Sequence, residues 1–135
     1  MQRHEMWPDL LLKEIEDHGA KLFVYGDSDC LTFAADCVLA MTNEDFMDGY
    51  RDYTTIEGAY KRLKRAGFDD IGAALASKFE EIPPSMAQRG DIGVLPGEGF
   101  LVAVVFVGPH AVGKDEPFGV KPVSRSLVTR AFRVP

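Results

Sequence analysis

The sequence is poor in the residue types that hold metals and form disulfides. Its 135 residues include only two cysteines and three histidines. These are Cys30, Cys37, His4, His18 and His110, and their spacing is not that of zinc ligands. If both cysteines lie on one helix, their Cα atoms are about 10.5 Å apart, farther than a disulfide spans. We therefore expect two reduced thiols, no metal and no cofactor.

Long hydrophobic runs and an excess of basic charge are also absent. No run reaches the roughly 18 apolar residues that a membrane-spanning helix needs. Residues 1–21 lack the apolar centre of a signal peptide, so we expect synthesis in the cytoplasm. The formal net charge is −6. Because phosphate binding needs clustered lysine and arginine, this charge disfavours nucleic acid as a partner.

What is present is the composition of a globular protein. Apolar residues make up 46% of the chain and charged residues 27%, which excludes disorder as the default expectation. A chain of this length buries roughly two thirds of the surface that its unfolded form exposes. We therefore expect one domain over residues 1–135.

Two helices are expected in the first 42 residues. Apolar residues at helical spacing over 7–19, with Pro8 in the first turn, predict the first one. The second carries Cys30 near its start, and Asp27 or Ser28 is expected to cap it.

Two more helices are expected before the part of the chain that has strand-like patterns. Thr54 and Glu57 have the spacing of a capping box, which predicts a helix that stops at Gly67. A short helix follows over 69–79, before a pair of prolines.

The last third of the chain reads as strands. Residues 91–95 and 100–107 flank a Pro/Gly turn, and the second run is continuously apolar, so it should be covered on both faces. Short strands and turns follow, and residues 131–135 form the last expected strand. Helices first and antiparallel strands after predict an α+β fold, with the helices packed on a C-terminal antiparallel sheet.

Cys30 is the strongest candidate for chemistry. A cysteine in the first helical turn meets free N–H groups and the positive end of the helix dipole, and both favour the thiolate. The nearby carboxylates of Asp27 and Asp29 oppose ionisation. The local pattern therefore leaves two readings open, a nucleophile and a small apolar residue at the start of a core helix.

The other polar candidates have structural readings. Cys37 is expected as a core thiol, and Asp36, beside the core face of the same helix, as a residue that holds a loop. Asp91 should fix the turn into its strand through side-chain hydrogen bonds. His4 and His18 are expected at the surface.

The order of motifs resembles the NlpC-type cysteine peptidases. It comprises a Y-G-x-x-D-C segment ending in Asp29 and Cys30, a helix bearing the cysteine, an "RGDI" segment over 89–92 and a hydrophobic strand. Those proteins are papain-like α+β enzymes that cut peptidoglycan stem peptides. Tyr25, Asp29 and Asp91 belong to these motifs and are further candidate site residues.

The whole chain also resembles a group of short phage and prophage proteins encoded among tail genes. The shared features are an early Trp7, "YGDSDCLTFAAD", "AMTN", "GAYKRLKRAG", "RGD" and "AFRV". This resemblance implies a virion component at the tail tip or in tail assembly. Its partners would be other tail-tip proteins, of the hub or the distal tail, and peptidoglycan is a further candidate.

The resemblance carries over only part of the active site. It places the nucleophile at Cys30 and the preceding aspartate at Asp29. The family's catalytic histidine falls on Val102, and its oxyanion-stabilising tyrosine falls on Phe23, which has no hydroxyl. Loss of the base and the oxyanion donor would remove most of the catalytic power of a thiol peptidase.

Three hypotheses follow. The first is a tail component with a degraded active site. The second is an active hydrolase that opens peptidoglycan during genome delivery, with Cys30 as nucleophile and His110 as an unusual base. The third is a cytoplasmic prophage protein outside the virion.

Overall fold

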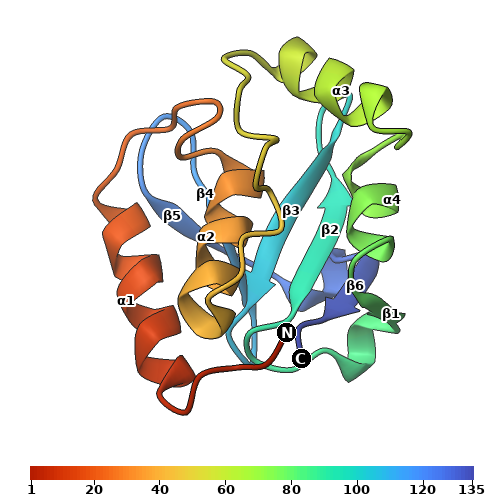
Figure 1. Cartoon of the computed structure of the whole chain (residues 1–135). Helices are drawn as coiled ribbons and strands as arrows, with labels where there is room; N and C mark the ends of the chain where they lie inside the picture. Colours follow the sequence, from red (N-terminus) through yellow and green to blue (C-terminus); the bar gives the residue numbers. More distant parts are fainter.

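In a computed structural model that describes residues 1–135, four helices precede the six strands of one antiparallel sheet (Figure 1). The helices are α1 (Trp7–Gly19), α2 (Cys30–Thr42), α3 (Ile56–Arg65) and α4 (Ile71–Ala76). The strands are β1 (Glu80–Ile82), β2 (Ile92–Pro96), β3 (Leu101–Phe106), β4 (Ala111–Lys114), β5 (Val120–Val123) and β6 (Arg130–Arg133). Short 3₁₀ turns are η1 (Pro84–Met86) and η2 (Arg125–Leu127). The predicted α+β fold is confirmed.

The sheet has the order β1-β6-β2-β3-β4-β5, with β2 and β3 at its centre. Ala103 and Val105 of β3 belong to the main core beneath α2, whereas Val104 and Phe106 belong to a second cluster on the opposite face. Side chains alternate between faces along a strand. The continuous apolar run of β3 is therefore buried on both sides, as predicted.

Helix α2 lies across the sheet in the middle of the molecule, and α1 packs beside it (Figure 1). Its inward side chains are fully buried, and they include Phe33, Cys37, Val38 and Met41. Cys37 is therefore the core thiol that the sequence predicted. Because α2 is fixed by this burial, the position of Cys30 at its first residue is fixed with it.

Two predicted helix caps are off by one or two residues. Asp29 caps α2, in place of Asp27 or Ser28, because its extended backbone lets its carboxylate accept from the N–H groups of Leu31 and Thr32. The Ser28 hydroxyl donates instead to the Leu22 carbonyl.

Thr55, and not Thr54, caps α3, and its hydroxyl accepts from the N–H of Gly58. Neighbouring polar residues compete for a capping position, and the backbone conformation at each one decides the outcome.

Strand β1 was not expected. It follows the short helix α4 and pairs with β6 at one edge of the sheet. Arg130 and Arg133 of β6 form ion pairs with Glu81 and Glu80 of β1. A strand of three residues gives almost no local signal, since its partner lies about fifty positions away.

The two ends of the chain lie side by side (Figure 1). The guanidinium of Arg3 donates to the Val134 carbonyl and forms an ion pair with Asp91. None of the helices has the length and apolar character needed to cross a membrane.

Candidate functional site

The site is built from the N-terminus of α2 outward, because Cys30 is the first residue of that helix. The carboxylate of Asp29 is the centre of the surrounding hydrogen bonds. Its Oδ1 accepts from the N–H of Leu31 at 3.0 Å and of Thr32 at 2.8 Å. Its Oδ2 accepts from the Gly26 N–H at 2.8 Å and from the Tyr53 hydroxyl at 2.6 Å.

These bonds assign Asp29 a structural task. A buried carboxylate that accepts four hydrogen bonds has little capacity left for another partner. Burial, followed by the charge of Asp29, raises the pKa of the Tyr53 hydroxyl, so Tyr53 remains a neutral donor to that carboxylate. The pair ties the start of α2 to the segment that leads into α3.

The surroundings of Cys30 hold its thiol in the neutral form. Burial raises the pKa of the thiol to about 11, and the charge of Asp29 adds to this effect. Backbone hydrogen bonds from Ala103, Leu31 and Cys30 itself act in the opposite direction. Desolvation is thus the largest influence on the pKa of the thiol, and it exceeds the opposing backbone hydrogen bonds at the helix N-terminus.

A cavity of about 360 Å³ opens beside this thiol, and we call it the Cys30 cavity. Phe23, Tyr25, Asp29 and Cys30 line one side of it, and residues from the start of β3 line another. The structure therefore brings three of the predicted site residues together, namely Tyr25, Asp29 and Cys30.

The start of β3 offers no proton-transfer group to Cys30. Leu101, Val102 and Ala103 are all apolar, and the Ala103 backbone is hydrogen-bonded to the thiol. Leu101 and Ala103 pack with the core under α2, whereas Val102 packs with the cluster on the opposite face of the sheet. At the start of β3, the side chain on the same face as α2 is thus that of Leu101. It lies one residue before Val102, the position on which the family's catalytic histidine falls.

His110 does not reach Cys30. It is exposed in the turn between β3 and β4, where its carbonyl accepts from the N–H of Val107. Val107 lies four positions along the chain from Ala103, which is about 13 Å at the usual rise of a strand. Strands β3 and β4 pair regularly at that end, and His110 is not among the residues that line the Cys30 cavity.

Asp91 also lies outside the Cys30 cavity. Its carboxylate is buried and accepts from the N–H groups of Gln88 and Val134, at 2.8 Å and 3.0 Å. It therefore fixes the turn before β2, as predicted, and anchors the chain's C-terminal residues as well.

Phe23 and Tyr25 stand in the wall of the Cys30 cavity and contact each other edge to face, with ring centroids 4.9 Å apart. The hydroxyl of Tyr25 is the polar group of this pair. Burial is the main cause of the raised pKa of Tyr25, so the phenol stays protonated and can act as a donor.

The prediction that His18 is a surface residue is wrong. Its imidazole is fully buried, its Nε2 lies 2.8 Å from Asp36 Oδ2, and its ring meets Phe33 edge to face. Asp36 in turn accepts from Arg51 at 2.8 Å. Asp36 thus holds the loop after α2, as expected. His4, by contrast, is exposed, as predicted.

The hydrogen bonds of His18 and Arg51 hold the pKa of Asp36 below its usual value, although burial alone acts to raise it. Glu14 Oε1 lies 3.6 Å from the same imidazole, and burial raises the pKa of Glu14. We call these residues, Glu14, His18, Asp36 and Arg51, the His18 network. Its three possible ligand groups, Glu14, His18 and Asp36, lie within 4.8 Å of one another.

Lys114 is a site residue that the sequence analysis missed. It is buried in the wall of the Cys30 cavity, and its ammonium donates to the carbonyls of His18 and Lys21 at 2.7 Å each. Cations favour the C-terminal carbonyls of a helix, and the His18 carbonyl lies in the last turn of α1, whereas Lys21 follows that helix. Burial lowers the pKa of Lys114. The sequence signal that could have identified Lys114 is its place at the end of an apolar strand.

Comparisons with known proteins agree with this architecture. A family described as a domain of unknown function (DUF6950) matches residues 2–134. No curated protein matches the chain. Among solved structures, the chain is similar to the crystal structure of the NlpC/p60 domain of peptidoglycan hydrolase SagA. The identity is 17%, the TM-score is 0.62, and the match covers 93% of this chain and 97% of that chain. The chain therefore belongs to the DUF6950 family and has an NlpC/p60-like α+β fold.

Proposed function

We propose that this protein is a non-catalytic NlpC-like domain that acts as a structural component of a phage tail tip or of tail assembly. The single observation that best supports the loss of catalysis is the environment of Cys30. Its thiol has a pKa raised to about 11 and lies beside the start of β3, where Leu101 and Ala103 pack on the same face as α2.

The chemistry of amide cleavage explains why this observation matters. A thiol needs a base to form the thiolate and an acid to protonate the leaving amine, and this proton transfer contributes about 10²–10⁴-fold. The Cys30 cavity contains no histidine. Of the two lysines that line it, Lys114 donates to the carbonyls of His18 and Lys21, and Lys121 lies 3.6 Å from Asp115, so both ammonium groups already have polar partners.

The assignment to a phage tail is supported by the resemblance of the whole chain to short proteins encoded among tail genes. In such a particle the domain would contact hub or distal tail proteins. Mass spectrometry of purified particles tests this part of the proposal. Absence of the chain from particles, with its presence in the infected-cell lysate, would contradict a virion role and favour a prophage protein outside the virion.

The alternative is an active peptidoglycan-cleaving hydrolase. The open Cys30 cavity and the backbone N–H groups around the thiol favour it over a domain with a filled site. Purified protein is incubated with peptidoglycan beside an active NlpC/p60 domain, and released muropeptides are measured by chromatography. We expect no release. Release that is lost in Cys30→Ala but kept in His110→Ala would establish a hydrolase with a base other than His110.

A further inference from the structure

The His18 network combines one imidazole nitrogen with two carboxylates at the junction of α1 and α2. Glu14 and His18 are four positions apart on α1, so their side chains lie on the same face of that helix. Asp36 of α2 faces them. His18 Nε2 lies 2.8 Å from Asp36 Oδ2 and 3.6 Å from Glu14 Oε1. Imidazole nitrogen and carboxylate oxygen are donors that zinc takes from proteins.

The spacing of these atoms is close to that of zinc ligands. Zinc binds such nitrogen and oxygen atoms at about 2.0–2.2 Å, so two ligand atoms of a tetrahedral site are about 3.3 Å apart. The observed separations of 2.8 Å and 3.6 Å lie on either side of this value. A small movement of the Glu14 and Asp36 side chains therefore brings all three ligand atoms to bonding distance of one ion.

Glu14 is the member of the network that has no hydrogen-bond donor. Its 3.6 Å contact with His18 Nε2 is longer than a hydrogen bond, and no other donor reaches its carboxylate. The charge of Asp36 lies nearby, since the ligand atoms of all three residues are within 4.8 Å of one another. A cation between the two carboxylates would offset both charges and give Glu14 the partner that it lacks.

Arg51 holds Asp36 in the orientation that a metal site requires. Its Nη2 donates to Asp36 Oδ1 at 2.8 Å, which leaves Oδ2 directed at His18. Outer hydrogen bonds of this kind orient ligating carboxylates. Arg51 is itself fixed by Asp45, whose carboxylate accepts from its Nε at 3.1 Å.

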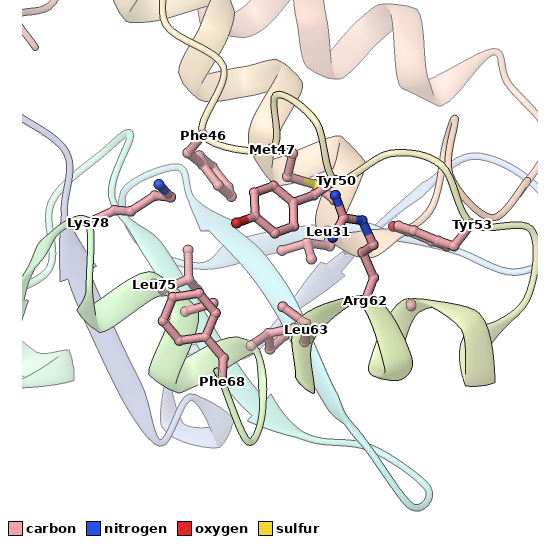
Figure 2. A pocket seen from close by; sticks show the side chains of 13 residues that line it. Leu31, Phe46, Met47, Tyr50, Tyr53, Arg62, Leu63, Phe68, Leu75 and Lys78 are labelled. Carbon is pink, nitrogen blue, oxygen red and sulfur yellow. The ribbon is translucent and has the colours of Figure 1, made fainter. Parts of the chain in front are cut away.

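Apolar packing holds the segment that carries Arg51. Figure 2 shows Phe46, Met47 and Tyr50 of this segment turned into the space between α2, α3 and α4. Met47 is buried, and the Phe46 ring meets Phe79 edge to face, with centroids 5.5 Å apart. The guanidinium is therefore positioned by the fold itself, before any ion binds.

The other ring nitrogen of His18 sets the strength of such a site. The short contact with Asp36 places the ring proton on Nε2 in the metal-free protein, and a metal at Nε2 moves this proton to Nδ1. Nδ1 is buried and has no partner. Because ligating histidines usually donate this second N–H to an acceptor, we expect weaker binding than at structural zinc sites.

We propose that Glu14, His18 and Asp36 bind a zinc ion, with water in the fourth position. Three protein ligands and one open position are the arrangement in which zinc keeps a water. The side chains of Glu14 and Asp36 are 23% and 18% exposed, so the ion can enter from solvent. Spacing along the sequence does not reveal the site, because its ligands come from two helices. The site depends neither on the thiol of Cys30 nor on a virion role.

Zn²⁺ itself, with Co²⁺ as a spectroscopic substitute, tests the proposal. The full chain is freed of metal with a chelator and titrated with Zn²⁺ by calorimetry, and we expect one site per chain. Co²⁺ should give the visible bands of a tetrahedral ion and no thiolate charge-transfer band, since neither cysteine is a ligand. In ¹⁵N NMR spectra, the ring proton of His18 should move from Nε2 to Nδ1 as Zn²⁺ binds. Mg²⁺ should not compete, because it requires octahedral oxygen ligands.

Two variants of α1 form a matched pair, since each removes one negative charge. Glu14→Gln should weaken Zn²⁺ binding at least about ten-fold, because loss of a ligand costs no less than loss of an outer partner. Glu16 is exposed and lies outside the network, so Glu16→Gln should bind like the parent. Glu14 accepts no hydrogen bond in the metal-free protein, so its replacement should leave the fold intact. Zn²⁺ should raise the unfolding temperature of the parent and of Glu16→Gln more than that of Glu14→Gln.

Four outcomes would overturn the proposal. The first is no change in the His18 ring signals when Zn²⁺ is added in excess. The second is equal binding by Glu14→Gln and Glu16→Gln, which would place the ion elsewhere, for example at the exposed His4 or His110. The third is a thiolate charge-transfer band with Co²⁺. The fourth is displacement of Zn²⁺ by Mg²⁺, which would contradict the assignment of the metal.

Discussion

Two residues of α2, Cys30 and Asp36, have different polar neighbours. At the start of the helix, Cys30 faces apolar residues of β3 and has no imidazole partner. Six residues farther along, Asp36 holds the buried imidazole of His18 at 2.8 Å. The molecule therefore does contain an imidazole–carboxylate pair, the arrangement that activates many nucleophiles.

That pair faces α1 and not the thiol. Six residues of helix correspond to a rise of about 9 Å, and the His18 ring packs against Phe33. This imidazole–carboxylate pair joins two helices and a loop, whereas no histidine lines the Cys30 cavity.

The largest expected effect is on stability, through the His18 network. His18→Ala removes a fully buried ring and its hydrogen bond to Asp36. We expect the free energy of unfolding to fall by about 2–4 kcal/mol, from lost packing and a lost buried hydrogen bond. Urea denaturation followed by circular dichroism measures it.

Cys30→Ala is the matched comparison at the other site, where we expect a loss of about 1 kcal/mol or less. If His18→Ala and Cys30→Ala lowered the free energy of unfolding equally, the His18 network would not be more important for stability than Cys30.

The second effect concerns the reactivity of Cys30. With a thiol pKa of about 11, compared with about 8.5 for a free cysteine, the thiolate fraction at pH 7 should be about 300-fold lower than in a model peptide. Alkylation by iodoacetamide, followed by mass spectrometry of the peptide that contains Cys30, should rise steadily up to about pH 11.

Cys37→Ala provides a chain with a single thiol for this measurement, and its profile should be unchanged because Cys37 is buried in the core. A plateau of alkylation reached below pH 7 would revive the active hydrolase.

The third effect concerns an imidazole introduced at the start of β3. Leu101 packs on the same side of β3 as α2, whereas Val102 packs on the other side. Leu101→His should therefore bring an imidazole near the thiol and raise alkylation of Cys30 at pH 7 by about ten-fold or more, because a nearby imidazolium favours the thiolate.

Val102→His is the control and should have no such effect. If instead Val102→His alone activates the thiol, the assignment of strand faces at this end of β3 is wrong.

The sequence was sufficient where the signals are local. The spacing of apolar residues and a glycine at the end predict helices α1 and α3. Two apolar runs around a Pro/Gly turn predict the β2–β3 hairpin. The place of Cys30 at the start of α2 follows from the polar segment that precedes an apolar helix. Each of these patterns is complete within about fifteen residues, so no knowledge of distant partners is needed.

The sequence was insufficient where long-range packing decides. His18 stands beside Gly19 at a helix end, which favours a surface position, and only the contact of α1 with α2 buries it against Phe33. The pKa of the Cys30 thiol depends on β3, about seventy residues away. Strand β1 likewise exists only through its pairing with β6.

The smallest expected effect is the acid dependence of stability that comes from the His18 network. The pKa of Asp36 is lowered in the folded protein, so its contribution is fully present above its unfolded pKa of about 3.9 and is lost as the pH falls through the folded value. Glu14 has the opposite sign, because its raised pKa disfavours the folded carboxylate above its own unfolded pKa.

Asp36→Asn should therefore lose less stability at pH 2.5 than at pH 7, by about 1 kcal/mol, since the carboxylate is partly exposed and screened. Glu14→Gln should gain a few tenths of a kcal/mol at pH 7 and nothing at pH 2.5. Urea denaturation of the three proteins at both pH values measures the differences. A loss in Asp36→Asn that does not change with pH would mean that His18 and Arg51 stabilise Asp36 by geometry alone, and that its charge contributes nothing to the join between α1, α2 and the loop.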